Sequence, residues 1–400
     1  MKQLHALVIG AGIGGTAAAI ALRRAGLDVS LFEQTVAQRE VGAGIQISPN
    51  ASRLLGRYGL DEAMAQAAVR PSAVVFRRWQ DGHVLGREEL GDAIENRYGT
   101  PYYHFHRADL ISLLADAFGR NEIELGGRLV DIEQDESGVT ARFEDGTSAR
   151  GDLLIGADGI HSQVRERLFG VEKPRFSGQI AYRGLAPSER VAHLGLPLEV
   201  TNWVGPGGHF VHYFVSSGRF LNFVAVSEEA TWTREQWSDR GSIDDAAKQY
   251  QGWHPQLATI LGAVDETFKW ALFDRNPLPE WTKGRVALLG DACHPMLPYM
   301  AQGAAQAIED GAALAACLKH SDFDIPSAFR AYVALRKPRA TEVQERSRAN
   351  ATSFHLPDGP EQLDRDRLFA TRGVRGSSEA MNKLYGYDAE VVAPTLEEKR

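Results

Sequence analysis

Residues 290–311, GDACHPMLPYMAQGAAQAIEDG, gather the most reactive side chains of the sequence. Asp291, Cys293 and His294 lie within four positions there, and carboxylate, thiolate and imidazole are common ligands of zinc. A thiol beside an imidazole can also serve as a nucleophile. A metal site, however, needs three or four ligands, and adjacent residues in a bend usually point apart. We therefore expect no metal here, interpret Cys293 as structural, and expect His294 to be a turn residue whose ring bonds to the backbone.

Glycines near the N-terminus follow a spacing with a defined chemical use. GAGIGG places Gly10, Gly12 and Gly15 in the GxGxxG pattern, with Gly14 between the last two. The first glycine of this pattern makes a tight turn, the second lets the backbone approach a pyrophosphate, and the third lets a helix pack on a strand. Glu33 lies 18 residues after Gly15, where a carboxylate can accept hydrogen bonds from a ribose.

The segments around these glycines supply the elements that must hold them. HALVIG (5–10) is typical of a buried parallel strand, TAAAIALRRAG (16–26) of a helix, and DVSLFE (28–33) of a second strand. The N-terminus of the helix offers free N–H groups and a positive dipole end to phosphates. The unit therefore predicts a dinucleotide site, but it suits NAD and FAD equally.

Two later segments repeat the order of strand, turn and helix. GDLLIGADGIHSQVRERL predicts a strand at 153–155 and a helix from Ser162. GRVALLGDACHP predicts a strand at 286–289, and the alanine-rich residues 304–320 predict a helix packed inside the fold. A plain nicotinamide dehydrogenase has no reason to carry both segments.

Composition narrows the class of protein. The chain has 400 residues, enough for one large α/β unit or two joined domains. Its net charge of −8 argues against nucleic acid as a partner. Two cysteines fit a reducing compartment. No apolar run reaches membrane-spanning length and the N-terminus lacks a signal-peptide pattern, so we expect a cytoplasmic protein without a membrane partner.

Together these motifs resemble those of the single-component FAD-dependent aromatic hydroxylases. That family has GxGxxG near the N-terminus, a DG motif in mid-chain and a GD motif about two-thirds along, which are matched by Gly10–Gly15, Asp158–Gly159 and Gly290–Asp291. The resemblance covers almost the whole chain. It includes VGAGIQISPN (41–50), HRADL (106–110), AQGAAQAIEDGAAL (301–314) and LYGYD (384–388).

The resemblance implies contacts with the cofactor. Arg107 should contact the flavin phosphates or ribityl chain, although an arginine that caps a helix with Asp109 would look the same. Asp158 should serve FAD and NAD(P)H, or else simply form the turn. Asp291 should bond the ribityl hydroxyls. A helix that begins near Gly303 and Ala304 would direct its positive end at the flavin ring and stabilise the reduced anion.

The sequence pattern changes in residues 176–275, where runs of aromatic and aliphatic residues are separated by glycine, proline and serine. This pattern predicts antiparallel strands. They resemble the sheet that roofs the substrate cavity in this family. Along residues 209–215, His209 and Tyr213 share one face of a strand and Phe210 the other. In hydroxybenzoate-type relatives, a His and a Tyr in this pattern reach the substrate phenol, so we expect both residues to be catalytic. A sheet-core tyrosine with a buried histidine is the alternative.

The resemblance also places residues beside the substrate. Gln46 lies where relatives place a residue near the flavin or substrate, and Pro298 and Tyr299 lie where relatives vary with their substrates. Arg183 suits a substrate carboxylate or a structural ion pair equally. The substrate is therefore open at this point, whereas the reaction class is not.

The expected fold is α/β: an FAD-binding Rossmann-like domain (1–70, 100–175 and 276–325), an inserted, mainly antiparallel substrate sheet (71–99 and 176–275) and C-terminal helices (326–400). The expected function is NAD(P)H- and O₂-dependent hydroxylation of a phenolic carboxylate of the salicylate or 3-hydroxybenzoate type, through a flavin C4a-hydroperoxide. Alternatives are a 6-hydroxynicotinate-type substrate, another ring such as urate, or a flavin-binding protein without hydroxylase activity. The resemblance favours NADH as the co-substrate, with NADPH as the alternative. It also suggests a homodimer, for which the long amphipathic segment at 329–351 is suited.

Overall fold

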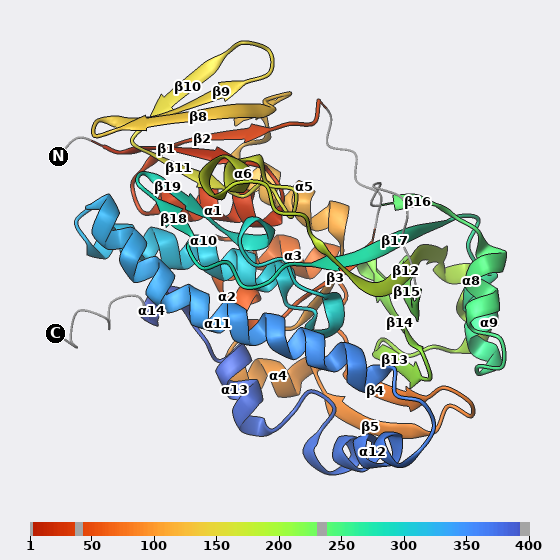
Figure 1. Cartoon of the computed structure of the whole chain (residues 1–400). Helices are drawn as coiled ribbons and strands as arrows, with labels where there is room; N and C mark the ends of the chain where they lie inside the picture. The colour runs from red at the N-terminus through yellow and green to blue at the C-terminus, as the bar shows by residue number, and fades with distance from the viewer. Residues whose placement is uncertain (1–2, 37–42, 230–237, 393–400) are drawn as a thin grey trace.

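The computed structural model describes residues 3–36, 43–229 and 238–392 (Figure 1). Two large sheets lie at opposite ends of the molecule, and the helices α10 (Gly303–His320) and α11 (Ile325–Phe354) run between them (Figure 1). Within the described ranges, no helix is both long and apolar enough to cross a membrane. The first two residues of VGAGIQISPN lie outside the described residues.

The six-stranded sheet contains the glycine motif. Its strands follow the order β18-β19-β11-β1-β2-β7, and all neighbours are parallel except β18 and β19. The parallel strands are apolar because helices cover the sheet. The strands are β1 (His5–Ile9), β2 (Asp28–Glu33), β7 (Ile123–Leu125), β11 (Leu153–Gly156), β18 (Thr282–Lys283) and β19 (Val286–Leu288).

Small residues let the helices next to this sheet approach closely. A Cβ atom on Gly14 would lie 2.8 Å from that of Ala307, and one on Gly311 would lie 2.6 Å from the Cα of Ala18. These contacts join α1 (Ile13–Arg24) to α10 and explain why both helices are rich in alanine. Other helices of this part are α2 (Pro49–Arg57), α3 (Asp61–Ala67), α5 (Arg107–Phe118) and α6 (Gln163–Phe169).

The eight-stranded sheet has the order β16-β17-β12-β15-β14-β13-β4-β5, and only its β13–β4 pair is parallel. One face packs on α8 (Ile243–Gln249) and α9 (Pro255–Leu261), and the other faces a cavity. Its strands are β4 (Ala73–Arg78), β5 (Val84–Glu89), β12 (Arg175–Pro187), β13 (Val200–Gly205), β14 (Gly208–Val215), β15 (Phe220–Glu228), β16 (Ser238–Gly241) and β17 (Thr267–Asp274).

Smaller elements complete the described chain. A two-stranded sheet of β3 (Gly44–Ile47) and β6 (Tyr103–His106) borders the cavity. A three-stranded sheet, at the top of Figure 1, contacts β1 and β11 of the six-stranded sheet. The three-stranded sheet contains β8 (Leu129–Asp135), β9 (Gly138–Phe143) and β10 (Ser148–Gly151). The other helices are α4 (Gly91–Tyr98), α7 (Ser188–Val191), α12 (Pro360–Arg372), α13 (Ser378–Tyr385) and α14 (Ala389–Val392).

The amphipathic segment expected at 329–351 is part of α11, a longer helix. Its buried residues, among them Phe329, Tyr332, Arg336 and Val343, recur at helical spacing. That stripe packs against α10 and the residues 298–300 of the same chain. The apolar face is therefore used within the chain, and the homodimer stays a prediction.

Candidate functional site

A cavity of about 720 Å³ lies between the glycine motif and the eight-stranded sheet. Cys293 and His294 are not among its lining residues. Of the residues assigned from sequence to cofactor or substrate, all but Gly15 line it: Gly10, Gly12, Gly14, Glu33, Gln46, Arg107, Asp158, His209, Tyr213, Asp291, Pro298, Tyr299, Gly303 and Ala304.

The geometry of the glycine loop fits a bound pyrophosphate. Gly10 has a positive φ of 102°, and a Cβ there would lie 2.5 Å from the carbonyl oxygen of Ala157. A Cβ on Gly15 would lie 1.9 Å from the carbonyl oxygen of Gly10, so helix and strand pack without space for a side chain. By contrast, a Cβ on Gly12 would meet no atom within 4 Å. The open space at Gly12 belongs to the cavity, where a phosphate can reach the backbone and the N-terminus of α1.

Glu33 ends β2 with its carboxylate at the edge of the cavity. Its Oε2 accepts a hydrogen bond from the backbone N–H of Ala11 at 3.0 Å, and its Oε1 accepts one from Thr35 at 3.0 Å. These bonds fix the carboxylate beside the glycine loop. Sequence reasoning missed Arg128, which also lines this end of the cavity. It follows β7, and the carboxyl ends of parallel strands are where ligands bind, so its position was a usable signal.

Asp158 lines the cavity and also forms the turn. Its carboxylate accepts hydrogen bonds from the backbone N–H groups of Gln163 (2.7 Å) and Val164 (3.1 Å) and from the Ser162 hydroxyl (2.5 Å). Burial raises the pKa of Asp158, and these bonds oppose the rise. Both interpretations from sequence are therefore compatible with its position.

Arg107 is the first residue of α5 and lines the cavity. Asp109, the residue considered as its partner in a helix cap, accepts a hydrogen bond from the Ser216 hydroxyl at 2.7 Å. Its other oxygen lies 3.7 Å from Nδ1 of His106.

The GD turn places Asp291 at the cavity, where α10 begins. The side chain of Asp291 is exposed to the cavity and otherwise surrounded by protein, and burial raises its pKa. Helix α10 starts at Gly303, as expected from sequence, and no side chain caps its N-terminus. Because Gly303 and Ala304 line the cavity, the free N–H groups and the positive dipole end of α10 face it.

A buried network of charges holds the GD turn against α10 and α11. Asp310 accepts a hydrogen bond from the backbone N–H of Gly290 at 2.9 Å and another from Nε of Arg336 at 2.8 Å. Arg336 also pairs with Glu309, and all three charged side chains are fully buried. Asn50 bonds both Glu309 (2.6 Å) and Gln302 (3.1 Å), the residue before α10. The network therefore fixes both ends of the loop that meets the cavity.

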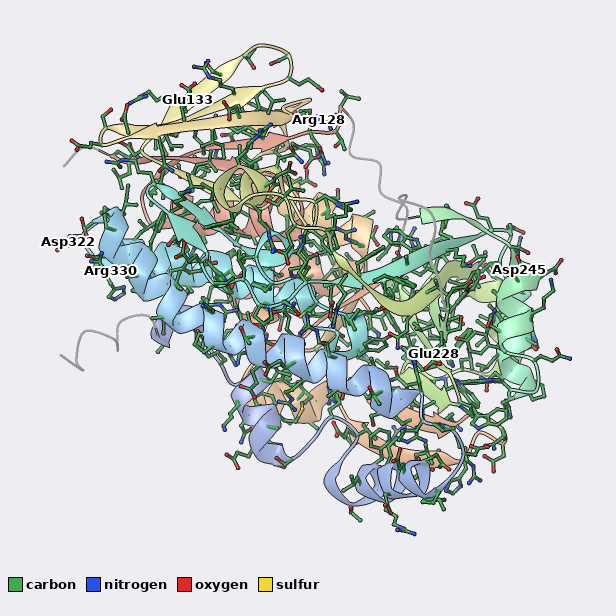
Figure 2. All side chains as sticks on the ribbon, in the orientation of Figure 1. Arg128, Glu133, Glu228, Asp245, Asp322 and Arg330 are labelled. Atoms are coloured by element: carbon green, nitrogen blue, oxygen red, sulfur yellow. The ribbon has the colours of Figure 1, made fainter. Side chains whose placement is uncertain are left out.

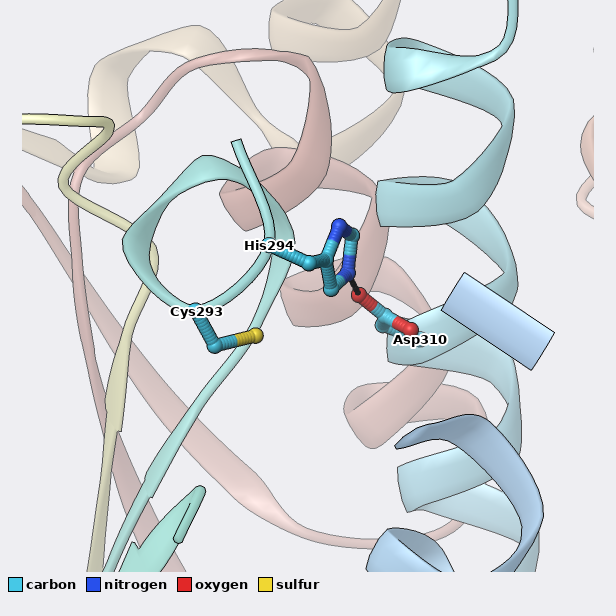
Figure 3. A group of neighbouring side chains, drawn as sticks. All are labelled: Cys293, His294 and Asp310. Carbon is cyan, nitrogen blue, oxygen red and sulfur yellow. Dashed lines mark hydrogen bonds and ion pairs between the residues drawn. The ribbon is translucent and has the colours of Figure 1, made fainter. Parts of the chain in front are cut away.

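Cys293, His294 and Asp310 offer ligand atoms within 4.8 Å of one another (Figure 3). The ring of His294 bonds through Nε2 to Asp310 at 2.5 Å, so the expectation of a backbone partner was wrong. Burial by itself would raise the pKa of Asp310, but His294 and Arg336 outweigh this effect and lower it to about 2. The Cys293 thiol lies 3.5 Å from the carbonyl oxygen of Gly290, and burial raises its pKa strongly. These contacts engage the three groups within the protein, which fits a structural role.

The cavity face of the eight-stranded sheet contains a row of side chains that runs across the strands. His209 and Tyr213 lie on either side of this row along β14. The face division expected for residues 209–215 is confirmed, because His209 and Tyr213 line the cavity while Phe210 packs in the core on the far face. In the row itself, residues of β12, β15, β14, β13 and β4 lie opposite one another: Arg183, Val224, Val211, Asn202 and Phe76.

Tyr213 is held by a short chain of hydrogen bonds. The Tyr102 hydroxyl donates to Oε1 of Gln46 at 2.6 Å. Gln46 also bonds the Tyr213 hydroxyl, and this bond opposes the strong rise that burial causes in the pKa of Tyr213. The amide N–H of Gln46 can donate to the Tyr213 oxygen, and in that arrangement the proton of Tyr213 is available to a ligand.

Arg183 is a cavity-lining cation. Its guanidinium lies 5.0 Å from the centre of the Trp270 ring, and Nε is buried without a hydrogen-bond partner. Burial lowers its pKa. Among the described residues no carboxylate pairs with it. An anionic group in the cavity would compensate this charge.

The sequence matches the family described as FAD binding domain over residues 3–347. It is 43% identical over 385 residues to the 3-amino-4-hydroxybenzoate 2-monooxygenase PtmB3 of Streptomyces platensis, which covers 96% of each chain. It is 38% identical to the 6-hydroxynicotinate 3-monooxygenase of Pseudomonas fluorescens, over 86% of this chain and 90% of that one.

The fold is similar to that of Klebsiella pneumoniae HpxO, solved in complex with FAD and uric acid. The two structures agree with a TM-score of 0.82 at 29% sequence identity, over 98% of this chain and 97% of the other. The family match covers most of the sequence, and the two relatives are named as monooxygenases of aromatic rings. The chain therefore belongs to the single-component FAD-dependent aromatic hydroxylases.

Proposed function

We propose that this protein uses NAD(P)H and O₂ to hydroxylate a small aromatic carboxylate that carries a ring hydroxyl. One observation carries the proposal: the cavity has a flavin cradle on one side and, on the other, a sheet face that presents His209, Tyr213 and Arg183 among apolar side chains. Such a face can hold one planar anion with few polar contacts.

The residues that would hold FAD follow from the geometry. The loop Gly10–Gly15 would bind the pyrophosphate, Glu33 a ribose, and Arg107 with Asp291 the ribityl and phosphate region. Asp158 would border both FAD and NAD(P)H. The N-terminus of α10 at Gly303 and Ala304 would stabilise negative charge on the ring. When bound, FAD supplies the electron transfer and the activation of oxygen.

His209 and Tyr213 would bind the ring hydroxyl of the substrate. Burial lowers the pKa of His209 and raises that of Tyr213, so near neutral pH the imidazole is uncharged and the phenol is protonated. Each therefore has a proton to donate. Two donors at one oxygen favour the phenolate over the phenol, because hydrogen bonds to the charged form stabilise it. A phenolate enriches the ring in electrons, as hydroxylation requires.

Arg183 would pair with the substrate carboxylate. It lies on β12, which is separated from Tyr213 on β14 by the single strand β15. Two strand spacings are about 9.6 Å, a distance that the long arginine side chain and a benzoate ring together bridge. In this arrangement the carboxylate and the hydroxyl are at opposite ends of the ring.

This arrangement favours a hydroxyl para to the carboxylate. The substrates named for both relatives above, 3-amino-4-hydroxybenzoate and 6-hydroxynicotinate, have that pattern. We therefore rank 3-amino-4-hydroxybenzoate first and 6-hydroxynicotinate second, ahead of the salicylate and 3-hydroxybenzoate expected from sequence. Pro298 and Tyr299, with Gln46, line the cavity where these rings would differ.

The test is a substrate panel with product identification. NADH and NADPH oxidation and hydroxylated product are measured with the four acids above, with urate, and with 2-aminophenol, which lacks the carboxylate. We expect coupled product from a para-hydroxy acid. Arg183→Met should raise KM for that acid by about 10- to 100-fold, since a charged hydrogen bond contributes about 1.5–3 kcal/mol. It should change KM for 2-aminophenol little. If no member accelerates NAD(P)H oxidation or gives product, the hydroxylase proposal fails.

A further inference from the structure

Four buried polar side chains form a chain of hydrogen bonds behind the substrate side of the cavity. Tyr299, before α10, donates through its hydroxyl to Oε1 of Gln179 on β12. Nε2 of Gln179 lies 3.2 Å from Nδ1 of His355, the residue after α11. Nε2 of His355 lies 2.8 Å from Nδ1 of His209 on β14. All four are at least nine-tenths buried.

The direction of this chain follows from what each group can donate. Burial raises the pKa of Tyr299, so its phenol keeps its proton and donates. Oε1 of Gln179 accepts the hydrogen bond from Tyr299, and the amide nitrogen therefore faces His355 as a donor. Nδ1 of His355 must then be the unprotonated nitrogen that accepts this hydrogen bond. Burial lowers the pKa of His355 to about 4, so the neutral ring carries its single proton on Nε2.

The same reasoning extends to His209. Nε2–H of His355 donates to Nδ1 of His209, which must therefore be the acceptor. Burial and the neighbouring His355 lower the pKa of His209, so this ring is also neutral and carries its proton on Nε2. The bond to His355 uses Nδ1 of His209 and leaves Nε2 for another partner, and the residue lines the cavity. A hydrogen-bond donor thus faces the ligand.

We propose that Gln179 and His355 are positioning residues that hold His209 in the Nε2–H tautomer, so that it donates to an oxygen of the substrate. The identity of that oxygen as the ring hydroxyl rests on the proposed function. The tautomer itself does not. The chain makes His209 a fixed donor, whereas an isolated neutral imidazole could present either a donor or an acceptor.

Glu228 is the competing partner of His355. Glu228 is labelled in Figure 2. Its Oε1 lies 3.9 Å from Nδ1 of His355, beyond hydrogen-bond distance, and its side chain is 61% exposed. A carboxylate close to Nδ1 would accept a proton there and reverse the chain. Glu228→Gln removes that possibility and leaves the other groups unchanged, so it is a matched control.

The decisive variant is Gln179→Glu. A carboxylate at this position accepts from both Tyr299 and Nδ1 of His355, which moves the proton of His355 from Nε2 to Nδ1. His209 must then donate from Nδ1, and its Nε2 becomes an acceptor toward the cavity. An adjacent carboxylate raises a histidine pKa by about 1–3 units, so His355, which starts at about 4, stays neutral at pH 8.

The tautomers are measured by ¹⁵N NMR on FAD-loaded protein with ring-labelled histidine at pH 8, and His209 is assigned by a His209→Gln spectrum. We expect the Nε2–H form of His209 in the natural chain and in Glu228→Gln, and the Nδ1–H form in Gln179→Glu. His355→Gln, whose amide N–H can replace the Nε2 donor, should retain Nε2–H. A His209 tautomer that is unchanged in Gln179→Glu, or reversed in Glu228→Gln, would overturn the proposal. FAD content and circular dichroism establish that each variant is folded.

A binding measurement separates this inference from the proposed function. Dissociation constants for 4-hydroxybenzoate and 4-methoxybenzoate are read from the change in flavin absorbance. The hydroxyl of the first compound can donate or accept a hydrogen bond, whereas the methoxy oxygen of the second can only accept one. Reversal of the His209 tautomer should weaken binding of the methoxy compound at least tenfold relative to binding of the hydroxy compound. If the tautomer reverses but this ratio does not change, the relay stands and the placement of the ring oxygen at His209 is wrong.

Discussion

Replacing Arg336 with Met would remove the cation at the centre of the buried network below the GD turn. Arg336 is fully buried and pairs with Glu309 and, at 2.8 Å, with Asp310. In Arg336→Met the methionine fills most of the space, but the two carboxylates lose their shared partner. Glu309 keeps Arg339, and Asp310 keeps His294 and the N–H of Gly290.

The size of the loss can be bounded. Breaking a buried ion pair on one side typically costs about 3–5 kcal/mol. The protein can also avoid a buried charge by protonating one carboxylate. With an unfolded pKa near 4, that protonation costs about 4 kcal/mol at pH 7 and about 2 kcal/mol at pH 5.5, from about 1.4 kcal/mol per unit. We therefore expect a loss of about 3–4 kcal/mol at pH 7 that falls to about 2 kcal/mol at pH 5.5.

The sign of this pH effect differs between the two proteins. In the natural chain the pKa of Asp310 is lowered to about 2, so the stability it contributes is present above pH 4 and is lost only as pH falls toward 2. It is constant between pH 5.5 and 7. In Arg336→Met, burial is no longer offset by Arg336, so the pKa of one of its two former carboxylate partners rises, and the folded state binds a proton and gains stability as pH falls.

The assay is urea unfolding followed by circular dichroism at pH 7 and 5.5, with saturating FAD for each protein. Arg346→Met on the same helix is the control. Arg346 lies 3.7 Å from Glu342 in an exposed pair, so its loss should change stability by less than about 0.5 kcal/mol. A loss below about 1 kcal/mol for Arg336→Met, or the same loss at both pH values, would refute the reasoning.

Three further substitutions test the glycine loop and the Cys293 cluster. Gly12→Ala adds a Cβ in open space, so the melting temperature of the FAD-free protein should be unchanged while FAD affinity, measured by fluorescence titration, falls about tenfold or more. Gly15→Ala places a Cβ 1.9 Å from a carbonyl oxygen and should lower stability by about 2–3 kcal/mol even without FAD; equal effects of the two would contradict the assigned roles. Cys293→Ala should cost about 1 kcal/mol in urea unfolding and leave turnover within about twofold, with or without EDTA; a loss on chelation that zinc restores would mean that the cluster binds metal.

Much of the cofactor side was readable from sequence because its signals are local. The strand predicted at 153–155 is β11, the helix predicted from Ser162 is α6 with Ser162 as its N-cap, and the helix predicted near Gly303 begins there. Each depends on residues within a few positions of one another: apolar runs, a capping serine, and glycines where a side chain would clash. The alternation along 209–215 likewise fixed which side chains share a face.

The partners of the polar side chains were decided only by the tertiary structure. His294 bonds to Asp310 rather than to the backbone because α10 brings that carboxylate to the turn. Arg183 lacks a described acidic partner, and His209 meets His355, which lies 146 residues away in the chain. A hydrogen bond requires two atoms within about 3 Å, and sequence periodicity does not specify distances between remote segments. The sequence by itself thus determined the strands, turns and helix starts that border the cavity and the face of the sheet that each side chain occupies, whereas packing of distant segments determined which polar groups on that face have partners.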